Sequence, residues 1–260
     1  MEIQYLVIGL GFVVGILVGL TGMGGGSLMT PLLILVLRIS PVVAVGTDLV
    51  QMTVTKAFGA WQHHRQGSVD YRLALKLAVG SVPGALAGVG FLTLLERQGV
   101  EVDALVSQVL GVALVIVAVL LFAKMVLGRW HFFGGGDGSE GFSLEQSRWL
   151  PVIAFTIGAL VGITSVGGGA LFMVVLVSMF PVMAMRRVVG TDVFHALLLT
   201  SVAGAAHWGA GHVDFALSAN ILIGSVPGVL IGSRMTAYIP SRGLRAIVIV
   251  TLFAVGLRML

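Results

Sequence analysis

Apolar residues run along the chain in long stretches, which short groups of polar residues, Gly and Pro separate. Most stretches have about 16 to 25 residues, enough for a helix to cross about 30 Å of hydrocarbon. The pattern predicts ten helical segments: 3–20, 28–38, 42–65, 71–95, 104–127, 149–163, 171–180, 184–208, 215–237 and 243–259. Two of them, 28–38 and 171–180, have only about ten residues and cover about half of that thickness, so we expect half-helices.

The composition is that of a protein in a lipid bilayer. Hydrophobic residues make up 57% of the chain and charged residues 10%, less than half of the charged fraction of about a quarter in soluble domains. The mean hydropathy is +1.06. We therefore expect an all-α polytopic membrane protein. Its basic residues lie mostly in loops, which indicates membrane topology rather than a nucleic-acid partner, and the N-terminus lacks the features of a cleaved signal peptide.

Several kinds of chemistry are not expected. The chain has no Cys, which excludes disulfides and Cys-ligated metals. It has no pair of His residues at a ligand spacing within one helix, and no Gly-x-Ser-x-Gly pattern of a nucleophile elbow. We expect no enzyme activity, no metal and no cofactor.

The chain is an internal duplication. The segments 15–28 and 158–171 are identical at nine of fourteen positions, and each is an apolar stretch interrupted by small residues. Beyond them the offset becomes 144: Gly46-Thr-Asp48 returns at 190–192 and Gly80-Ser-Val-Pro-Gly84 at 224–228. We expect two membrane repeats of about five helical elements each, 1–127 and 149–260, connected by a Gly-rich loop, 128–148.

The positions of basic residues predict inverted repeats. If each half-helix returns to its starting side, every repeat has three full crossings, and the second repeat is upside down relative to the first. One side then receives Arg65, Arg72, Lys76, Lys124, Arg129, Arg148, Arg186, Arg187, Arg234, Arg242 and Arg245, and the other receives Arg38, Arg97 and Arg258. Parallel repeats would divide these residues evenly. The positive-inside rule favours the inverted arrangement, with both termini outside the cytoplasm.

The two interruptions, here called the breakers, are candidate binding sites. A helix that begins inside the membrane presents unpaired N–H groups and the positive end of its dipole, and glycines let a small anion approach them. Broken helices in matching positions of two halves typically hold a transporter's substrate. Alternatively, the glycines serve only packing or a hinge. The candidate substrate-binding residues in the breakers are Thr21, Gly22, Met23, Gly24, Gly25, Gly26, Ser27, Thr164, Ser165, Gly167, Gly168 and Gly169.

Lys56 is the further substrate-binding candidate, because it is the single Lys or Arg well inside a predicted span. An ionised side chain there is costly and is a functional hypothesis by default. It could offset the charge of an anion or take part in proton coupling. Alternatively, it reaches towards the headgroups or pairs structurally with Asp48, although two helical turns make a direct pair a stretch. Its repeat counterpart is Thr200, so the duplication does not explain it.

Four polar residues are candidates for coupling to a proton or another ion: Asp48, Gln51, Asp192 and His195. His195 matches Gln51 in the repeat and lies one turn beyond Asp192; a His can relay protons near neutral pH. The structural alternatives are a buried, hydrogen-bonded His and two acids in the first turns of helices that begin in effect at Thr47 and Thr191, where the dipole stabilises them.

The motifs resemble the sulfite exporter TauE/SafE family of bacterial anion carriers. They are the breaker Gly22–Gly26 followed by an apolar half-helix and Pro31, the segment Ala44–Thr47, the box Gly80–Gly84, and their repetition. The resemblance covers about residues 5 to 258; Asp48 and Asp192 depart from it, because an uncharged residue such as Ser is expected there.

The resemblance implies a multi-pass protein of the bacterial cytoplasmic (inner) membrane that transports sulfite, sulfoacetate or a related anion. With the breakers, it favours a carrier working by alternating access. An anion channel and a non-transporting scaffold or sensor are the alternatives. The expected partners are a small anion such as sulfite, the lipid bilayer and a coupled proton. The oligomeric state is left open, a homodimer included.

Overall fold

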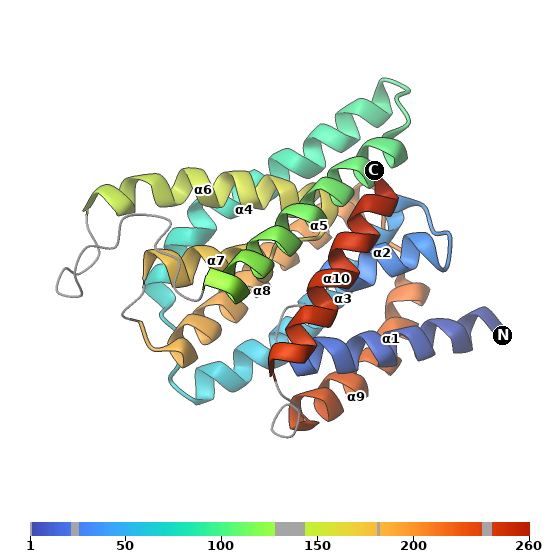
Figure 1. The fold of residues 1–260 in the computed structure, drawn as a ribbon. Coiled ribbons are helices and arrows are strands. Elements are labelled where there is room, and N and C mark those ends of the chain that lie inside the picture. The colour runs from blue at the N-terminus through green and yellow to red at the C-terminus, as the bar shows by residue number, and fades with distance from the viewer. Residues whose placement is uncertain (1, 22–25, 128–143, 181–182, 236–240) are drawn as a thin grey trace.

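The predicted helices are all present in a computed structural model, which describes residues 2–21, 26–127, 144–180, 183–235 and 241–260. The helices are α1 (Glu2–Thr21), α2 (Gly26–Leu35), α3 (Pro41–Arg65), α4 (Tyr71–Arg97), α5 (Val102–Leu127), α6 (Leu144–Thr164), α7 (Ala170–Met179), α8 (Met185–Gly209), α9 (Phe215–Met235) and α10 (Ser241–Met259) (Figure 1). The largest difference is at α6, which begins five residues before the predicted 149. Hydropathy alone misses its first turn, because that turn is polar.

The protein is an all-α polytopic membrane protein. Within the described residues, four helices are long and apolar enough to cross a bilayer: α4, α8, α9 and the segment Val102–Ala123 of α5. Large apolar side chains cover the outside of the bundle; Val79 and Val126, for example, are 71% and 63% exposed. Such a surface is stable against lipid tails and would be an aggregation hazard in water.

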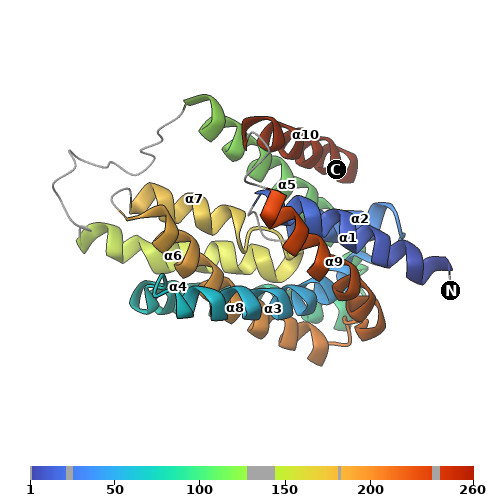
Figure 2. The ribbon, with the colours of Figure 1, turned by 90° about the horizontal axis from the view of Figure 1, so that it is seen from below.

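Helices α2 and α7 are half-helices, as predicted. Each has ten residues, about 15 Å at 1.5 Å per residue, which is half of the hydrocarbon thickness. In two perpendicular views, α2 turns back along α1 towards the end where α1 begins, and α7 does the same along α6 (Figures 1 and 2). The second breaker therefore lies at the tip of a helical hairpin, and α1 and α2 form the matching hairpin.

Small residues hold the two halves together at closely matched crossings. Helices α4 and α6 run side by side, and a Cβ at Gly84 would overlap the carbonyl oxygen of Phe155. The matching helices α1 and α9 cross in the same way, because a Cβ at Gly15 would lie 2.5 Å from the carbonyl oxygen of Ser225. Gly in these boxes therefore has a packing role that is typical of membrane helices.

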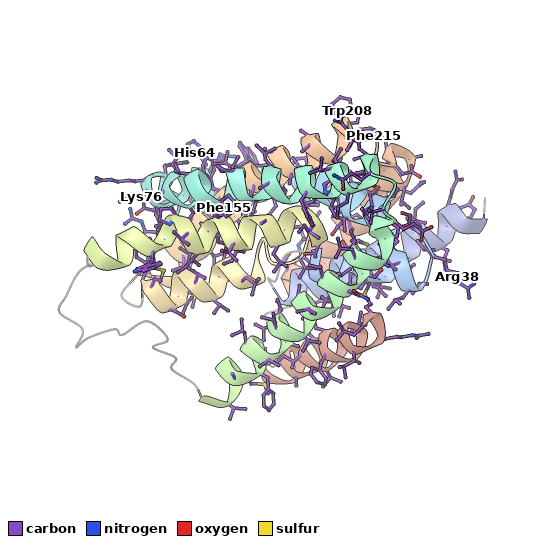
Figure 3. All side chains as sticks on the ribbon, turned by 90° about the horizontal axis from the view of Figure 1, so that it is seen from above. Arg38, His64, Lys76, Phe155, Trp208 and Phe215 are labelled. Atoms are coloured by element: carbon purple, nitrogen blue, oxygen red, sulfur yellow. The ribbon has the colours of Figure 1, made fainter. Side chains whose placement is uncertain are left out.

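The sequence-matched helices α3 and α8 pack against each other in opposite directions. An added Cβ at Gly59, near the end of α3, would meet Val193 near the start of α8, and one at Gly204, late in α8, would meet Val50 early in α3. Figure 3 places Lys76 and His64 towards one end of the bundle and Arg38 at the other. Sequence-matched helices that run in opposite directions are what inverted repeats predict, and the inverted arrangement itself stays a prediction.

Two matched hydrogen bonds explain why Gly-Thr-Asp and Val-Asp occur in both halves. The Thr191 hydroxyl accepts from the backbone N–H of Asp70 (2.9 Å), and the Thr47 hydroxyl accepts from that of Asp214 (3.0 Å). Asp70 in turn caps α4 by accepting from the N–H of Leu73. Each half thus fixes the start of a helix in the other half.

Candidate functional site

The second breaker, residues 165–169, is buried over most of its length. Gly167 has a φ of 105°, which glycine adopts readily because it has no Cβ. Ser165 has a φ of 59°, and holding a non-glycine residue there costs about 1–3 kcal/mol. The Thr164 hydroxyl donates to the Leu160 carbonyl (2.7 Å) and accepts from the N–H of Val166 (3.2 Å). Thr164 therefore stabilises the break itself.

The first breaker is described only at its edges. Gly22, Met23, Gly24 and Gly25 lie outside the described residues, as do the side chains of Thr21 and Ser27, so the roles predicted for them stay predictions. Gly26 is the first residue of α2.

A cavity of about 220 Å³ lies among α1, α2, α3, α8 and α9. Gly15 and Gly19 of α1 line it on one side of the break and Met29 of α2 on the other, while α3, α8 and α9 close it. The volume is below the range of about 300–1,000 Å³ that suits drug-sized ligands. The cavity is therefore suited to a small solute.

The polar side chains that line the cavity are one cation, one amide and three hydroxyls, and the amide and the hydroxyls can each donate and accept hydrogen bonds. Lys56, partly buried, and Gln51 line it from α3, and Ser225 and Ser233 line it from α9. The Gln51 amide donates to the Ser225 hydroxyl across 3.3 Å. None of its described lining residues is acidic. The electrostatics of this cavity therefore favour an anion.

A matched polar pair occupies the corresponding place in the other half. His195 of α8 forms a 2.7 Å hydrogen bond through Nε2 with the Ser81 hydroxyl of α4, and its ring packs against Phe172 at 4.4 Å. Because His195 matches Gln51 and Ser81 matches Ser225 at offset 144, the same two positions are joined twice. Their chemistry differs, since an amide donor in one half corresponds to an imidazole in the other.

Lys56, which lines the cavity, lies within electrostatic range of this second polar pair. Its ammonium interacts electrostatically with Asp192 and with His195. Asp192 is buried, and its Oδ1 has no hydrogen-bond partner among the described residues. Lys56 therefore lines the cavity and also lies within electrostatic reach of the buried Asp192. A negative charge that enters the cavity can change the interaction between these two residues.

Asp48 lies in a separate polar cluster made by both half-helix hairpins. Its Oδ2 accepts hydrogen bonds from the hydroxyls of Thr30 on α2 (2.7 Å) and Ser165 in the second breaker (2.6 Å). These two hydroxyl oxygens are themselves 2.7 Å apart. The three residues are fully buried, and we call them the Thr30–Asp48–Ser165 triangle.

The structure corrects one interpretation of the two acids. Asp48 and Asp192 are not first-turn residues, because α3 begins at Pro41 and α8 at Met185, seven residues earlier in each case. The helix dipole acts mainly within the first turn, so it does not explain the acids. A direct pair of Asp48 with Lys56 is not found among the described residues, where hydroxyls bind Asp48 instead.

Sequence reasoning missed several of these residues. Thr30, Ser81 and Ser225 all bind site residues, and the available signal was a lone hydroxyl inside an apolar helix. His207, which is not among the predicted site residues, is fully buried, bonds the Gly162 carbonyl at 2.8 Å and contacts His212.

Comparison with known proteins gives consistent matches over the whole chain. The family model described as Sulfite exporter TauE/SafE matches residues 7–259. The "Probable membrane transporter protein YjnA" of Bacillus subtilis (strain 168) is 39% identical, in a match that covers 96% of this chain and 97% of the relative. The "Probable membrane transporter protein YdhB" of the same organism is 25% identical, with the same coverage of each chain. No solved structure matches the chain.

Proposed function

Because the chain belongs to the sulfite exporter TauE/SafE family of membrane transporters, we propose that it carries small oxyanions, sulfite foremost, across the bacterial cytoplasmic membrane by alternating access. The observation that supports this best is the 220 Å³ cavity among α1, α2, α3, α8 and α9, with one cation, several groups that can donate hydrogen bonds and no acid among its described lining residues. Sulfite is small and carries three oxygen acceptors, which match such a set.

In this proposal the anion lies between α2 and α3. The Lys56 ammonium binds one oxygen by a charge-assisted hydrogen bond. The Gln51 amide and the Ser225 hydroxyl, which bond each other in the empty cavity, turn to the remaining oxygens. The N-terminal end of α2 adds a favourable dipole, because this helix begins at Gly26, three residues before the lining residue Met29.

The proposed movement uses the duplicated architecture. We propose that segments 1–127 and 149–260 are inverted repeats, with both termini outside the cytoplasm, and that the two hairpins exchange their positions relative to α3 and α8. The antiparallel packing of α3 on α8 supports this, because a two-fold relation between repeats makes inward and outward states equivalent in architecture.

Counterflow in proteoliposomes tests the function. Vesicles containing the purified chain and unlabelled sulfite should take up labelled external sulfite faster than protein-free vesicles, which correct for passive leak. Lys56→Ala should lower this exchange by about ten- to a hundredfold, since a hydrogen bond to a charged group contributes about 1.5–3 kcal/mol. Arg72→Ala, which removes an exposed cation from the start of α4, is the matched control and should keep wild-type exchange.

Other outcomes would contradict the proposal. Steady currents without counterflow would indicate a channel, and absence of flux for sulfite, sulfoacetate and other small oxyanions would indicate a scaffold or sensor. Wild-type exchange by folded Lys56→Ala protein would remove the cavity from the proposed pathway.

A further inference from the structure

The Thr30–Asp48–Ser165 triangle poses a question of proton counting. Three oxygen atoms, Thr30 Oγ1, Asp48 Oδ2 and Ser165 Oγ, lie 2.6–2.7 Å from one another. These are hydrogen-bond lengths for each of the three contacts. An O···O contact of this length is favourable only if a hydrogen lies between the two atoms.

Two hydroxyl groups supply two protons, whereas the triangle has three contacts. If Asp48 is ionised, both hydroxyls donate to Oδ2, and the contact between Thr30 and Ser165 is left without a hydrogen. If Asp48 carries a proton on Oδ2, this O–H donates to one hydroxyl, that hydroxyl donates to the other, and the last donates back to Oδ2. The protonated form therefore completes a closed ring.

A second observation agrees with the neutral form. The other carboxyl oxygen, Oδ1, is buried and has no hydrogen-bond partner among the described residues. An ionised carboxylate placed away from water needs donors or a cation at both oxygens. Neither is found near Oδ1 in the described part of the chain.

The ionisable side chains on the helices around Asp48 do not supply a positive charge to Asp48 Oδ1, because each has another partner or lies at a helix end. Helices α2, α6 and α7 carry no ionisable side chain among those described. Among the described ionisable groups on the other helices packed against α3, His195 bonds Ser81, His207 bonds Gly162, Arg186 bonds Gln66 and Asp103 bonds Ser40. Arg187 pairs with Asp70, Asp192 interacts with Lys56, and Arg234 lies in the last turn of α9.

We propose that Asp48 is the proton-carrying group of this transporter and that its proton closes the triangle, which fastens the second breaker to α2 and α3. This inference rests on the proposed function and names its coupling ion. Loss of the proton leaves a buried negative charge and an unfavourable contact between two hydroxyl oxygens. The triangle then opens, and the second hairpin is released from the first.

Two residues of the triangle lie close along their helices to residues that line the cavity. Asp48 lies one turn before Gln51 on α3, and Thr30 follows Met29 on α2; Gln51 and Met29 both line the cavity. An anion that displaces α2 therefore moves Thr30 as well. Asp192 lacks such a triangle, because the repeat offset puts Met173 at the position of Thr30 and Gly22 at that of Ser165.

The test separates exchange from proton-driven accumulation in proteoliposomes of the full chain. Labelled sulfite is the probe, the membrane voltage is clamped, and protein-free vesicles correct for passive movement of the acid. An imposed pH gradient should make the wild type accumulate sulfite. Asp48→Asn should reduce this accumulation by at least about tenfold, in the usual range of coupling effects, while equal-pH exchange changes much less.

Asp103→Asn is the matched control, because Asp103 of α5 also accepts from a serine hydroxyl, that of Ser40, but lies beside the start of α3 and has no contact with the triangle among the described residues. It should keep the accumulation. Thr30→Val retains the carboxyl but breaks the ring, and it should shift the pH dependence of accumulation, which makes the proposal testable even if Asp48→Asn does not fold.

Three results would overturn the inference while leaving sulfite transport intact. They are unchanged pH-driven accumulation in Asp48→Asn, an unshifted pH dependence in Thr30→Val, and wild-type accumulation that follows a Na⁺ gradient instead of a pH gradient. Absence of wild-type exchange at equal pH would instead be a failure of the proposed function, so the two failures are distinguishable.

Discussion

Replacing Ser165 by Ala and by Gly should destabilise the protein by different amounts, with glycine the better tolerated. Both variants lose the hydroxyl that contacts Asp48 at 2.6 Å and Thr30 at 2.7 Å. Each lost hydrogen bond contributes about 0.5–1.5 kcal/mol, and partners left unsatisfied add to the loss. We therefore expect Ser165→Ala to lower the free energy of unfolding by about 2–3 kcal/mol.

The difference between the variants follows from the backbone. Ser165 has a φ of 59°, and the left-handed region costs about 1–2 kcal/mol for a residue with a Cβ. Glycine avoids that cost but loses about 0.5–1 kcal/mol through the greater freedom of its unfolded chain. Ser165→Gly should therefore be the more stable variant by up to about 1 kcal/mol, or about 2–4 °C in Tm for a chain of this size.

Thermal unfolding in detergent, followed by circular dichroism, measures both variants. Ser201 is the matched control, because its hydroxyl bonds the Leu197 carbonyl within α8. In a helix interior glycine is about 1 kcal/mol worse than alanine, so the order of the two variants should be reversed there. If Ala is as stable as Gly at position 165, or more so, the reasoning about the breaker's backbone is refuted.

Two further predictions concern packing and topology. Gly84→Val should abolish a monodisperse folded peak in size-exclusion chromatography, because a Cβ there overlaps the Phe155 carbonyl oxygen. Gly90→Val on the same helix should keep that peak, because a Cβ at Gly90 meets nothing within 4 Å. Equal behaviour of the two variants would contradict the close crossing of α4 and α6. The chain has no Cys, so single cysteines report sidedness cleanly: Arg38→Cys should react with an impermeant maleimide on intact cells, and Lys76→Cys only after permeabilisation. The reverse pattern would overturn the proposed orientation.

The helices could be predicted from the sequence because hydropathy and length determine them almost alone. The half-helices were predicted as well, since a stretch of about ten apolar residues is too short to span a bilayer. The start of α3 was also readable: Ser40 followed by Pro41 is a typical helix start, and Pro41 is indeed the first helical residue. Placing the effective start at Thr47 ignored that signal, which is why the dipole explanation of Asp48 was wrong.

The polar contacts could not be predicted, because they depend on how distant helices pack. Thr30 and Ser165 are 135 residues apart and belong to different repeats, and a threonine in an apolar half-helix has no pattern that assigns it a partner. The link between Gln51 and Ser225 likewise requires α3 to contact α9. The duplication identifies which positions are equivalent, but it does not predict their contacts. These contacts depend on where the helices cross through their small residues.

The residues repeated in both halves and those that differ have separate physical roles. Thr47 and Thr191, with Asp70 and Asp214, make the same interlocking bonds twice, so they hold the scaffold in a nearly symmetric form. Two identical inverted repeats would give inward and outward states of equal energy, and an ion with equal affinity for both states would not shift their balance. The unequal residues remove this equality: Thr30 and Ser165 form the triangle with Asp48, whereas Met173 and Gly22 stand at the matching positions, and Lys56 has Thr200 as its counterpart. A proton at Asp48 then stabilises one state alone, and differential stabilisation of this kind is the physical condition for coupling an ion gradient to movement of an anion.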